Sequence, residues 1–285
     1  VFELIEEIIK GISLLKEMNS KIQDRLLSFG ERLSTRIFSE YLESQECSSY
    51  YLDVRDIMTT NSDFGQAKPF LNKLKQRSNR LFSKLAKDSQ VFVTQGFIGR
   101  DDAGNTTTLG RGGSDYTASL IAESLNASHV EIWTDVPGVI SADPRYIPQA
   151  QTISEITFNE ASELAVFGAK VLHPSTLIPA MRRGLPVYVA SSFERHKKGT
   201  WIKKDCLYKP EFRALSLREN QVLLTISSPE MLLKPGFIVE VFEILAKHQI
   251  SVDLVSTSEV SISITVNFPE KLTKEVLKEM KEIGP

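Results

Sequence analysis

The residues of this chain that most directly indicate chemistry form the glycine-rich stretch 106–115, with the sequence TTTLGRGGSD. Glycines let backbone N–H groups approach a ligand closely, and Arg111 can hold a carboxylate or phosphate through two parallel hydrogen bonds. We expect Ser114 to cap the helix that follows, and the N-terminus of a helix favours anions. The stretch is therefore predicted to bind a negatively charged ligand.

The elements on either side position this stretch. Residues 91–99 form a short apolar run that ends in glycines, which predicts a buried strand. Residues 116–125 have helical spacing, with Asp115 in the first turn. The ligand site would then lie beyond the carboxyl end of a strand, where open α/β sheets bind ligands. A glycine-rich junction is often only a tight turn, but the succession from Arg111 to Asp115 favours a functional role.

Composition excludes several classes of protein. The 285 residues are 41% hydrophobic and 25% charged with a net charge of -2, which is ordinary for a globular protein and gives no reason to expect nucleic acid. No apolar run approaches the roughly 20 residues that span a bilayer, so no membrane partner is expected. Cys47 and Cys206 are far apart and outside any metal motif, so we expect free thiols in a cytoplasmic protein. The chain begins at Val1 without a signal peptide, and we expect it to be the interior of a longer protein.

The rest of the chain alternates between predicted helices and strands, which indicates a layered α/β domain. The spacing predicts helices within residues 1–44, at 69–87, from 115, at 158–165 and at 173–183, and strands at 49–54, 91–94, 129–133 and 186–190.

The pattern breaks between residues 197 and 220, where we place a domain boundary. Beyond it we expect a strand at 222–226, a helix at 237–248, strands at 252–256 and 260–266, and a helix from Pro269. The order βαββα lacks one strand of the ferredoxin-like βαββαβ unit. We therefore expect the C-terminal end to be cut short.

Four segments, in order, resemble the aspartate kinases of the amino-acid kinase superfamily, in particular the lysine-sensitive type. They are SFGERLS at 28–34, TQGF at 94–97 with residues 106–115, IWTDVPG at 132–138 with DPR at 143–145, and FGAKVLHP at 167–174. The resemblance implies an α/β amino-acid kinase fold, a layered α/β sandwich with an open sheet, followed by an α+β ferredoxin-like ACT domain, both incomplete. The domains would be a catalytic domain at 1–208, a linker at 209–220 and the ACT domain at 221–285.

The resemblance also implies a reaction. Aspartate kinases transfer the γ-phosphoryl group of ATP to the side-chain carboxylate of L-aspartate and form 4-phospho-L-aspartate, the first step of lysine, threonine and methionine biosynthesis. Phosphoryl transfer depends mainly on positioning and charge neutralisation. ATP would be the co-substrate with Mg²⁺, which we expect nucleotide and water to hold, so no protein ligand is assigned. A homodimer or higher oligomer is expected.

The residues that the resemblance implies have distinct roles. Arg111 would hold the α-carboxylate of aspartate and Glu31 its ammonium group, while Lys170 would act as a point charge. Asp115 is negative and would orient the site's lysines or accept a hydrogen bond from the amine. The set is Glu31, Phe97, Arg111, Gly112, Gly113, Ser114 and Asp115 for aspartate; Thr134, Asp135, Arg145, Lys170 and Val171 for the nucleotide; and Asp115 and Lys170 for catalysis.

Three further residues, in or near these segments, are not assigned to ligand binding. For Trp133 we expect packing within its strand, and for His173, which precedes Pro174, a structural place at a helix start. Ile140 stands where relatives commonly place an aromatic residue beside the nucleotide, so a stacking contact there is not predicted.

The region 251–261 resembles the effector loop of ACT domains from lysine-sensitive aspartate kinases, which implies feedback inhibition by L-lysine. Without the resemblance, a β-turn rich in Ser and Thr is the simpler interpretation. The implied effector residues are Met231, Ser251, Val252, Asp253, Thr257, Ser258 and Glu259.

One family feature is missing from the sequence. Family members begin with a strand and a Lys-Phe-Gly-Gly-Thr-Ser loop that cradles the ATP phosphates, and nothing similar occurs in this chain. We therefore expect little or no kinase activity from residues 1–285 alone. Two alternatives remain. One is a non-catalytic amino-acid-sensing regulatory subunit. The other is an amino-acid kinase that acts on a glutamate derivative, which Glu31 and the ACT module make less favoured.

Overall fold

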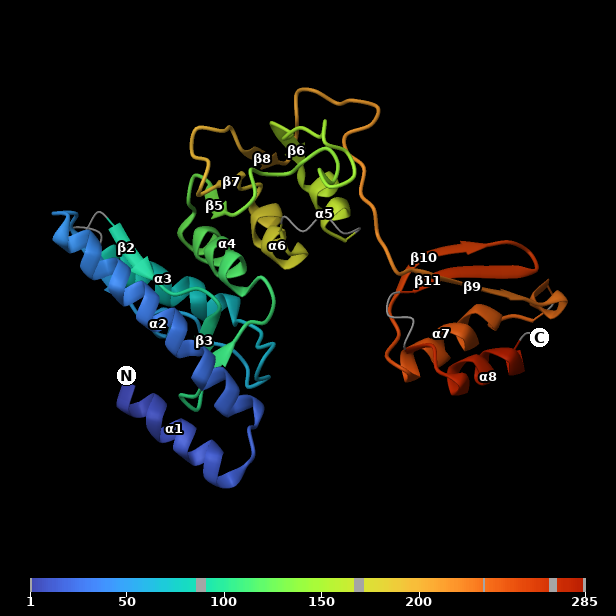
Figure 1. Cartoon of the computed structure of the whole chain (residues 1–285), viewed down its shortest axis with the longest axis horizontal. Helices are drawn as coiled ribbons and strands as arrows, with labels where there is room; N and C mark the ends of the chain where they lie inside the picture. Colours follow the sequence, from blue (N-terminus) through green and yellow to red (C-terminus); the bar gives the residue numbers. More distant parts are fainter. Residues whose placement is uncertain (1, 86–90, 167–171, 233, 267–270, 284–285) are drawn as a thin grey trace. The chain divides into compact units, whose positions relative to one another are not determined.

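The computed structural model describes residues 2–85, 91–166, 172–232, 234–266 and 271–283. The chain divides into two compact units, residues 1–216 and 217–285. The division falls within residues 209–220, although the extent of a linker there stays a prediction. Each unit is described by itself, and Figure 1 gives the element labels.

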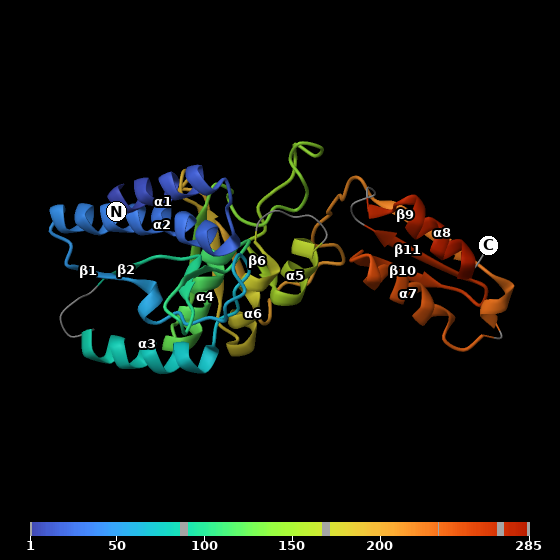
Figure 2. The same ribbon diagram turned by 90° about the horizontal axis from the view of Figure 1, so that it is seen from below.

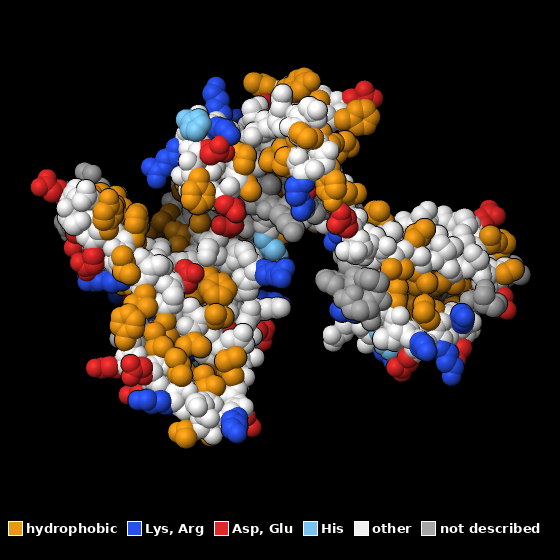
Figure 3. Space-filling view, viewed as in Figure 1, with side chains coloured by type: hydrophobic (Ala, Val, Ile, Leu, Met, Phe, Trp, Pro, Cys, Tyr) orange, Lys and Arg blue, Asp and Glu red, His pale blue; other side chains and the backbone are white. Residues whose placement is uncertain are grey.

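The first unit opens with two helices, α1 (Phe2–Leu15) and α2 (Ser20–Ser44), which lie side by side in Figures 1 and 2. Asn19 caps α2, because its side-chain oxygen accepts a hydrogen bond from the backbone N–H of Ile22 at 2.9 Å. Apolar side chains gather over these helices on the face shown in Figure 3. The exposed apolar residues of the two helices include Leu14, Ile37 and Phe38.

Strand β1 (Ser49–Leu52) pairs in parallel with β2 (Val91–Thr94), and helix α3 (Leu71–Leu85) lies between them in the sequence. The strand predicted over 49–54 is too long. It ends at Leu52 because the Asp53 side chain accepts from the N–H of Arg55 and starts the 3₁₀ helix η1 (Val54–Asp56). Lys87, the predicted end of α3, lies outside the described residues.

The run 91–99, predicted as one buried strand, is divided: β2 ends at Thr94, and residues 98–108 form a β-hairpin that was not predicted and that leads into the glycine-rich stretch. Strands β3 (Ile98–Arg100) and β4 (Thr106–Thr108) are antiparallel, and helix α4 (Gly113–Leu125) follows. Buried apolar residues between β1, η1, β3, α3 and α4 form one core; they are Leu52, Val54, Ile57, Met58, Leu74, Ile98 and Leu120.

A four-stranded mixed sheet completes the first unit, in the order β5-β7-β8-β6. Its strands are β5 (Val130–Thr134), β6 (Glu155–Thr157), β7 (Val187–Ser191) and β8 (Thr200–Lys203), and the helices beside it are α5 (Phe158–Val166) and α6 (Pro174–Arg183). β5 and β7 are parallel, β7 and β8 antiparallel, and β8 and β6 parallel. A second core of fully buried residues, including Ile156, Leu177 and Val187, joins sheet and helices.

The second unit has the βαββα order that the sequence predicted. Strands β9 (Val222–Ser227), β10 (Val252–Thr257) and β11 (Ser261–Val266) form an antiparallel sheet in the order β10-β11-β9. Helices α7 (Phe237–Lys247) and α8 (Lys274–Ile283) cover one face of it, and the short η2 (Pro229–Leu232) follows β9. Pro269, the predicted start of the last helix, lies outside the described residues. Among the residues that the structure describes, no helix combines the length and apolar character needed to cross a membrane.

Candidate functional site

The loop after β2 is anchored by the buried side chain of Gln95. Its amide oxygen accepts from the N–H of Val54 at 2.9 Å, and its amide nitrogen donates to Thr35 at 2.8 Å and to the Tyr51 hydroxyl at 2.9 Å. These bonds tie the end of β2 to β1 and to α2, which carries Glu31 one helical turn before Thr35. The carboxyl end of β2 is therefore held in place before the loop begins.

Glycines allow this loop to pack against α4 with no room for side chains. A Cβ on Gly96 would lie 2.7 Å from the Ser114 Cα, and one on Gly113 would lie 2.8 Å from the Phe97 ring. Phe97 itself has a φ of 68°, and its N–H donates to the Thr117 hydroxyl at 3.1 Å. The predicted substrate residues Phe97, Gly113 and Ser114 are thus brought together at the start of α4.

The start of α4 differs from the sequence prediction. Ser114 is not the cap: the helix begins at Gly113, and the N-cap is Gly112, which has a left-handed φ of 68° and provides no side-chain hydrogen bond. Glycine adopts this conformation without steric cost. No side chain caps the first N–H groups of α4. The Gly113 N–H donates to the Gly110 carbonyl at 3.1 Å, so the N–H groups of Ser114 and Asp115 are the ones that can face a ligand.

Gly112 also brings helix α6 to the same loop. A Cβ on Gly112 would lie 2.5 Å from the Cβ of His173. His173 is the N-cap of α6, and its Nδ1 accepts from the Ser175 N–H at 3.3 Å, which confirms the structural place predicted for it. The crowded contact between Gly112 and His173 therefore joins α4 and α6 at their N-termini.

Arg111 is exposed and lines an open groove of about 540 Å³. The groove runs from the segment 66–71 past Gly110 to Tyr116, His173 and Ser175, and Lys68 adds a second cation to it. With no negative side chain among its described lining residues, this groove can accept a small anion.

The two carboxylates predicted for the site share one property. Burial raises the pKa of Glu31 on α2, and burial likewise raises the pKa of Asp115 in the first turn of α4. Both are carboxylates in partly desolvated places, which is typical of groups that receive a charged ligand.

The residues predicted for the nucleotide lie at the carboxyl end of β5. The Thr134 hydroxyl donates to Asp135 at 3.1 Å, and the Thr134 carbonyl accepts from the N–H of Ser192, just after the parallel neighbour β7. Thr134 and Asp135 therefore sit where two parallel strands end together, a usual position for ligands in α/β sheets.

The segment after Asp135 is pinned to the sheet. Gly138 has a φ of 129°, and a Cβ there would lie 2.6 Å from the Thr200 hydroxyl. Thr200 donates to the carbonyl of Ile153 at 2.6 Å and accepts from the N–H of Val139 at 2.8 Å. One buried threonine therefore fixes both ends of the loop that carries Arg145.

Arg145 is paired with an acidic residue of its own loop. Its guanidinium pairs with the Asp143 carboxylate, with Nη2 to Oδ2 at 2.6 Å and Nε to Oδ1 at 3.1 Å. Trp133 is 48% exposed and donates to Glu131, with its ring edge-on to Tyr188, so its packing is on the surface of the sheet. Lys170 and Val171 lie outside the described residues, as does the FGA segment before them.

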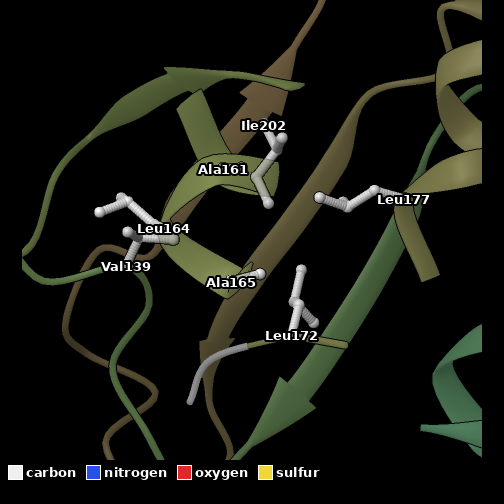
Figure 4. A pocket seen from close by; sticks show the side chains of 7 residues that line it. All are labelled: Val139, Ala161, Leu164, Ala165, Leu172, Leu177 and Ile202. Atoms are coloured by element: carbon white, nitrogen blue, oxygen red, sulfur yellow. The ribbon is translucent and has the colours of Figure 1, made fainter. Parts of the chain in front are cut away.

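A small apolar cavity lies between α5 and the sheet (Figure 4). Its volume is about 10 Å³, and the seven labelled side chains that line it are all aliphatic. A space of this size is too small for a ligand and has no polar group to hold water.

The predicted effector residues are separated in the second unit. Ser251, Val252 and Asp253 lie at the start of β10, whereas Thr257, Ser258 and Glu259 lie at its end. An extended strand of this length spans roughly 17 Å, so the two groups do not form one small site within a single unit. Met231 lies at the second end, because the N–H of Ser228 beside it donates to the carbonyl of Val260.

Asp253 is already engaged by a cation. Its Oδ1 lies 2.9 Å from Nη1 of Arg218, and the side chains are 12% and 28% exposed. The pair is close by distance but does not have hydrogen-bond geometry, since Arg218 Nη1 has no hydrogen-bond partner. An effector amine at Asp253 would have to share this carboxylate with Arg218.

Sequence reasoning missed Asp24, which is 1% exposed on α2. Its carboxylate accepts from the N–H and hydroxyl of Thr108, both at 2.8 Å, and from the N–H of Gly65 at 2.9 Å. It therefore ties α2 to the strand that enters the glycine-rich stretch. The only signal was an acidic residue on an amphipathic helix, which is ordinarily solvent-facing.

Among the described residues, no group of three or more His, Cys, Asp and Glu side chains is arranged to hold a metal ion. Cys47 and Cys206 are both free, and burial raises the pKa of the Cys206 thiol.

Comparison with known proteins agrees with this geometry. The chain matches the Amino acid kinase family over residues 5–191 and an ACT domain over residues 224–281. Lysine-sensitive aspartokinase 3 of Escherichia coli (strain K12) is 48% identical over 93% of this chain, which covers 60% of that protein.

Two crystal structures of E. coli aspartokinase III are also similar. The complex with lysine and aspartate (T-state) has a TM-score of 0.81 and 46% identity, covering 99% of this chain and 65% of that one. The complex with aspartate and ADP (R-state) has a TM-score of 0.80 and 45% identity, covering 99% of this chain and 66% of that one. The chain thus spans less than two thirds of each of these relatives.

Proposed function

Because this chain belongs to the amino acid kinase family, we propose that it is the kinase and ACT portion of an aspartate kinase. The reaction would transfer the γ-phosphoryl group of ATP to the side-chain carboxylate of L-aspartate. The observation that carries the proposal is the crowded glycine loop, which presents Arg111 and the uncapped start of α4 beside each other. The similar E. coli enzyme, crystallised with aspartate and ADP, supports the choice of substrates.

The residues proposed to bind aspartate carry charges opposite to those of the groups they would hold. Arg111 would hold the α-carboxylate with its planar guanidinium, and Glu31 would hold the α-ammonium. The N–H groups of Gly112, Ser114 and Asp115 would stabilise charge on the reacting carboxylate and the transferred phosphoryl group, because the Gly113 N–H already donates to the Gly110 carbonyl. Asp115 would orient the ammonium or a lysine of the site.

The nucleotide side would lie at the end of β5. Thr134 and Asp135 would contact the adenosine, and Arg145 would reach the phosphates after leaving Asp143, with Lys170 and Val171 completing this side. Mg²⁺ would arrive with the ATP phosphates and neutralise part of their charge. No protein ligand for it is assigned.

Regulation by L-lysine is the second part of the proposal. It rests on the ACT domain at residues 224–281 and on the lysine-sensitive relative. Because Ser251–Asp253 and Thr257–Glu259 lie at opposite ends of β10, two copies of the domain would be needed to bring both groups to one lysine. A homodimer or larger oligomer in the cytoplasm, with the domains at 1–208 and 221–285, is part of the same proposal.

A regulatory subunit without activity has less support. The similar proteins are aspartokinases. The charges of Arg111 and Glu31 are opposite to those of the α-carboxylate and the α-ammonium group of aspartate.

The test is an assay of acyl-phosphate formation, trapped with hydroxylamine, with aspartate or glutamate and with or without lysine. Because the chain spans less than two thirds of its relatives, both residues 1–285 and the complete gene product are assayed. We expect little or no activity from residues 1–285 alone. In the complete gene product we expect aspartate to be the substrate, and Arg111→Lys to raise KM for aspartate at least tenfold, because lysine cannot make the bidentate contact.

The matched control is Arg183→Lys, at the exposed end of α6, which should leave KM unchanged. Turnover of glutamate in preference to aspartate by the complete gene product would contradict the proposal. So would an Arg111→Lys variant with the KM of the unsubstituted enzyme.

A further inference from the structure

A basic cavity lies on the first unit, apart from the groove at Arg111. It has a volume of about 440 Å³ and lies between α3, η1 and the end of β3. Three of its cations come from α3, namely Arg77, Arg80 and Lys84, and the fourth is Arg100. It shares no lining residue with the Arg111 groove.

Among the described lining residues of this cavity, four cations face a single acid. Within the described part of the chain, none of the four cations forms an ion pair, and Asp56 is the only acid among the lining residues. Arg77 makes one long contact, 3.5 Å, to the Asp56 carbonyl. Lys73, on the same helix, is by contrast paired with Asp102 at 2.7 Å. Four like charges around one cavity repel each other, and a bound anion would relieve that repulsion.

The backbone holds these cations on rigid elements. Arg77, Arg80 and Lys84 have i, i+3 and i+7 spacing, so they project from one face of α3. The backbone of Arg100 is fixed on both sides, because its N–H donates to Met58 at 2.9 Å and its carbonyl accepts from Thr60 at 2.9 Å. The backbone positions of the four cations are therefore set before any ligand arrives, so binding has to order only their side chains.

The floor and rim of the cavity are apolar and aromatic. Ile57 is fully buried beneath it, Leu81 is partly buried, and the Tyr50 ring is 37% exposed at the rim. A ligand can therefore place oxyanion groups on the four cations and an apolar or planar part against this surface.

We propose that this cavity binds a small polyanion, a metabolite with two or more phosphate or carboxylate groups. The site is separate from those proposed for aspartate and ATP, and it does not depend on the kinase activity.

The test is calorimetric titration of residues 1–285 with pyrophosphate and with citrate at low ionic strength. We expect at least one of them to bind, and Arg80→Ala or Arg100→Ala to weaken that binding at least tenfold. Any additional binding that Arg111→Ala removes is assigned to the other groove. The tighter of the two probes identifies the phosphate or the carboxylate class. Binding of neither would overturn the proposal.

Two matched controls separate this site from general charge and from the proposed kinase site. Lys75→Ala removes an exposed cation about 160° around α3 from Arg77, and Arg111→Ala removes the cation of the other groove. Lys75→Ala should bind the probe as the unsubstituted chain does, and Arg111→Ala should leave unchanged the binding that depends on Arg80 and Arg100. Equal weakening by Lys75→Ala, or loss of binding only with Arg111→Ala, would refute the assignment.

A measurement without substitutions guards against variants that fail to fold. Phenylglyoxal modifies accessible arginines, and peptide mass spectrometry locates the modified residues. The bound probe should slow modification of Arg77, Arg80 and Arg100 at least fivefold while Arg183 reacts at an unchanged rate. Equal protection of all four, or of none, would contradict the proposed site.

Discussion

Asp115 holds its carboxylate in a partly buried place at the start of α4, where burial raises its pKa above the ordinary value of 3.8. The ionised form is therefore less favourable in the folded chain than in the unfolded chain. Stability is lost as pH rises through the folded pKa, and the loss is absent below the unfolded pKa. A buried carboxylate of this kind is retained where a charged ligand needs it.

We expect Asp115→Asn to raise the free energy of unfolding at pH 7 by about 0.5–1 kcal/mol, because the substitution removes the cost of ionisation. The gain should shrink as pH falls through the folded pKa toward 3.8. Urea denaturation at pH 7 and pH 4 measures both values.

Asp101 supplies a control of opposite sign. Burial raises the pKa of Asp101, but hydrogen bonds from Asn105 and Ser62 outweigh it and lower the pKa. Asp101→Asn should therefore destabilise the chain at pH 7. A stability gain from Asp115→Asn that is the same at both pH values would show that ionisation is not its cause.

Gly112 allows a second residue-level prediction, because it combines a left-handed backbone with a crowded surrounding. Its φ is 68°, and an added Cβ would lie 2.5 Å from His173. Gly112→Ala should cost about 3 kcal/mol or more, from backbone strain together with displacement of the α6 N-terminus. Thermal and urea unfolding measure the loss.

Gly184 is the matched control for the backbone effect. It has a φ of 61° and nothing within 4 Å of an added Cβ. Gly184→Ala should cost only the strain, about 1–2 kcal/mol. Equal losses at the two glycines would mean that the contact between Gly112 and His173 contributes nothing.

Among the elements, α2 depends on Asp24 for its attachment to β4. The carboxylate accepts three hydrogen bonds within 2.9 Å and is 1% exposed. Asp24→Ala would leave buried donors on Thr108 and Gly65 without a partner, and we expect a loss of about 2–4 kcal/mol in the free energy of unfolding.

Asp24→Asn tests whether charge or shape matters in this attachment. The amide keeps one accepting oxygen, so it should recover part of the stability that alanine loses. A loss below about 0.5 kcal/mol for Asp24→Ala would show that α2 is held by its apolar contacts alone.

The elements also show what a sequence can and cannot predict. Helices such as α6, with apolar residues at regular spacing and a His-Pro start, were predicted to within a residue of their observed bounds. Strands β3 and β6 have three residues each, too few to display a period, and were missed. The cap of α4 was placed at Ser114 because a serine is recognised by its side chain, whereas Gly112 caps through its backbone angle.

Some residues of the candidate site were predicted from the sequence and others were not. Arg111 and its glycines were found because they are adjacent in the sequence. Their supports, Asp24 and Gln95, act through hydrogen bonds to residues as many as 84 positions away, and such contacts leave no local pattern. Local motifs therefore indicated the chemistry, but they did not indicate what holds it in place.

At the scale of the whole molecule, the chain has two units with separate cores. The core of the second unit includes Phe237, Val241, Ile262 and Val276, all 2% exposed or less. Each core is closed by its own sheet and helices. We therefore expect the second unit, residues 217–285, to fold alone, which a single cooperative urea transition would show.

The first residues of that unit decide where it begins. A fragment of residues 221–285, which starts where the sequence analysis placed the ACT domain, lacks Arg218 and leaves the Asp253 carboxylate without this partner. Because Asp253 is only 12% exposed, we expect the shorter fragment to be about 1–3 kcal/mol less stable. Arg218→Ala in the longer fragment should cause a similar loss, which separates the ion pair from the effect of shortening. If both fragments unfold at the same urea concentration, the pair contributes no stability and the unit begins at residue 221.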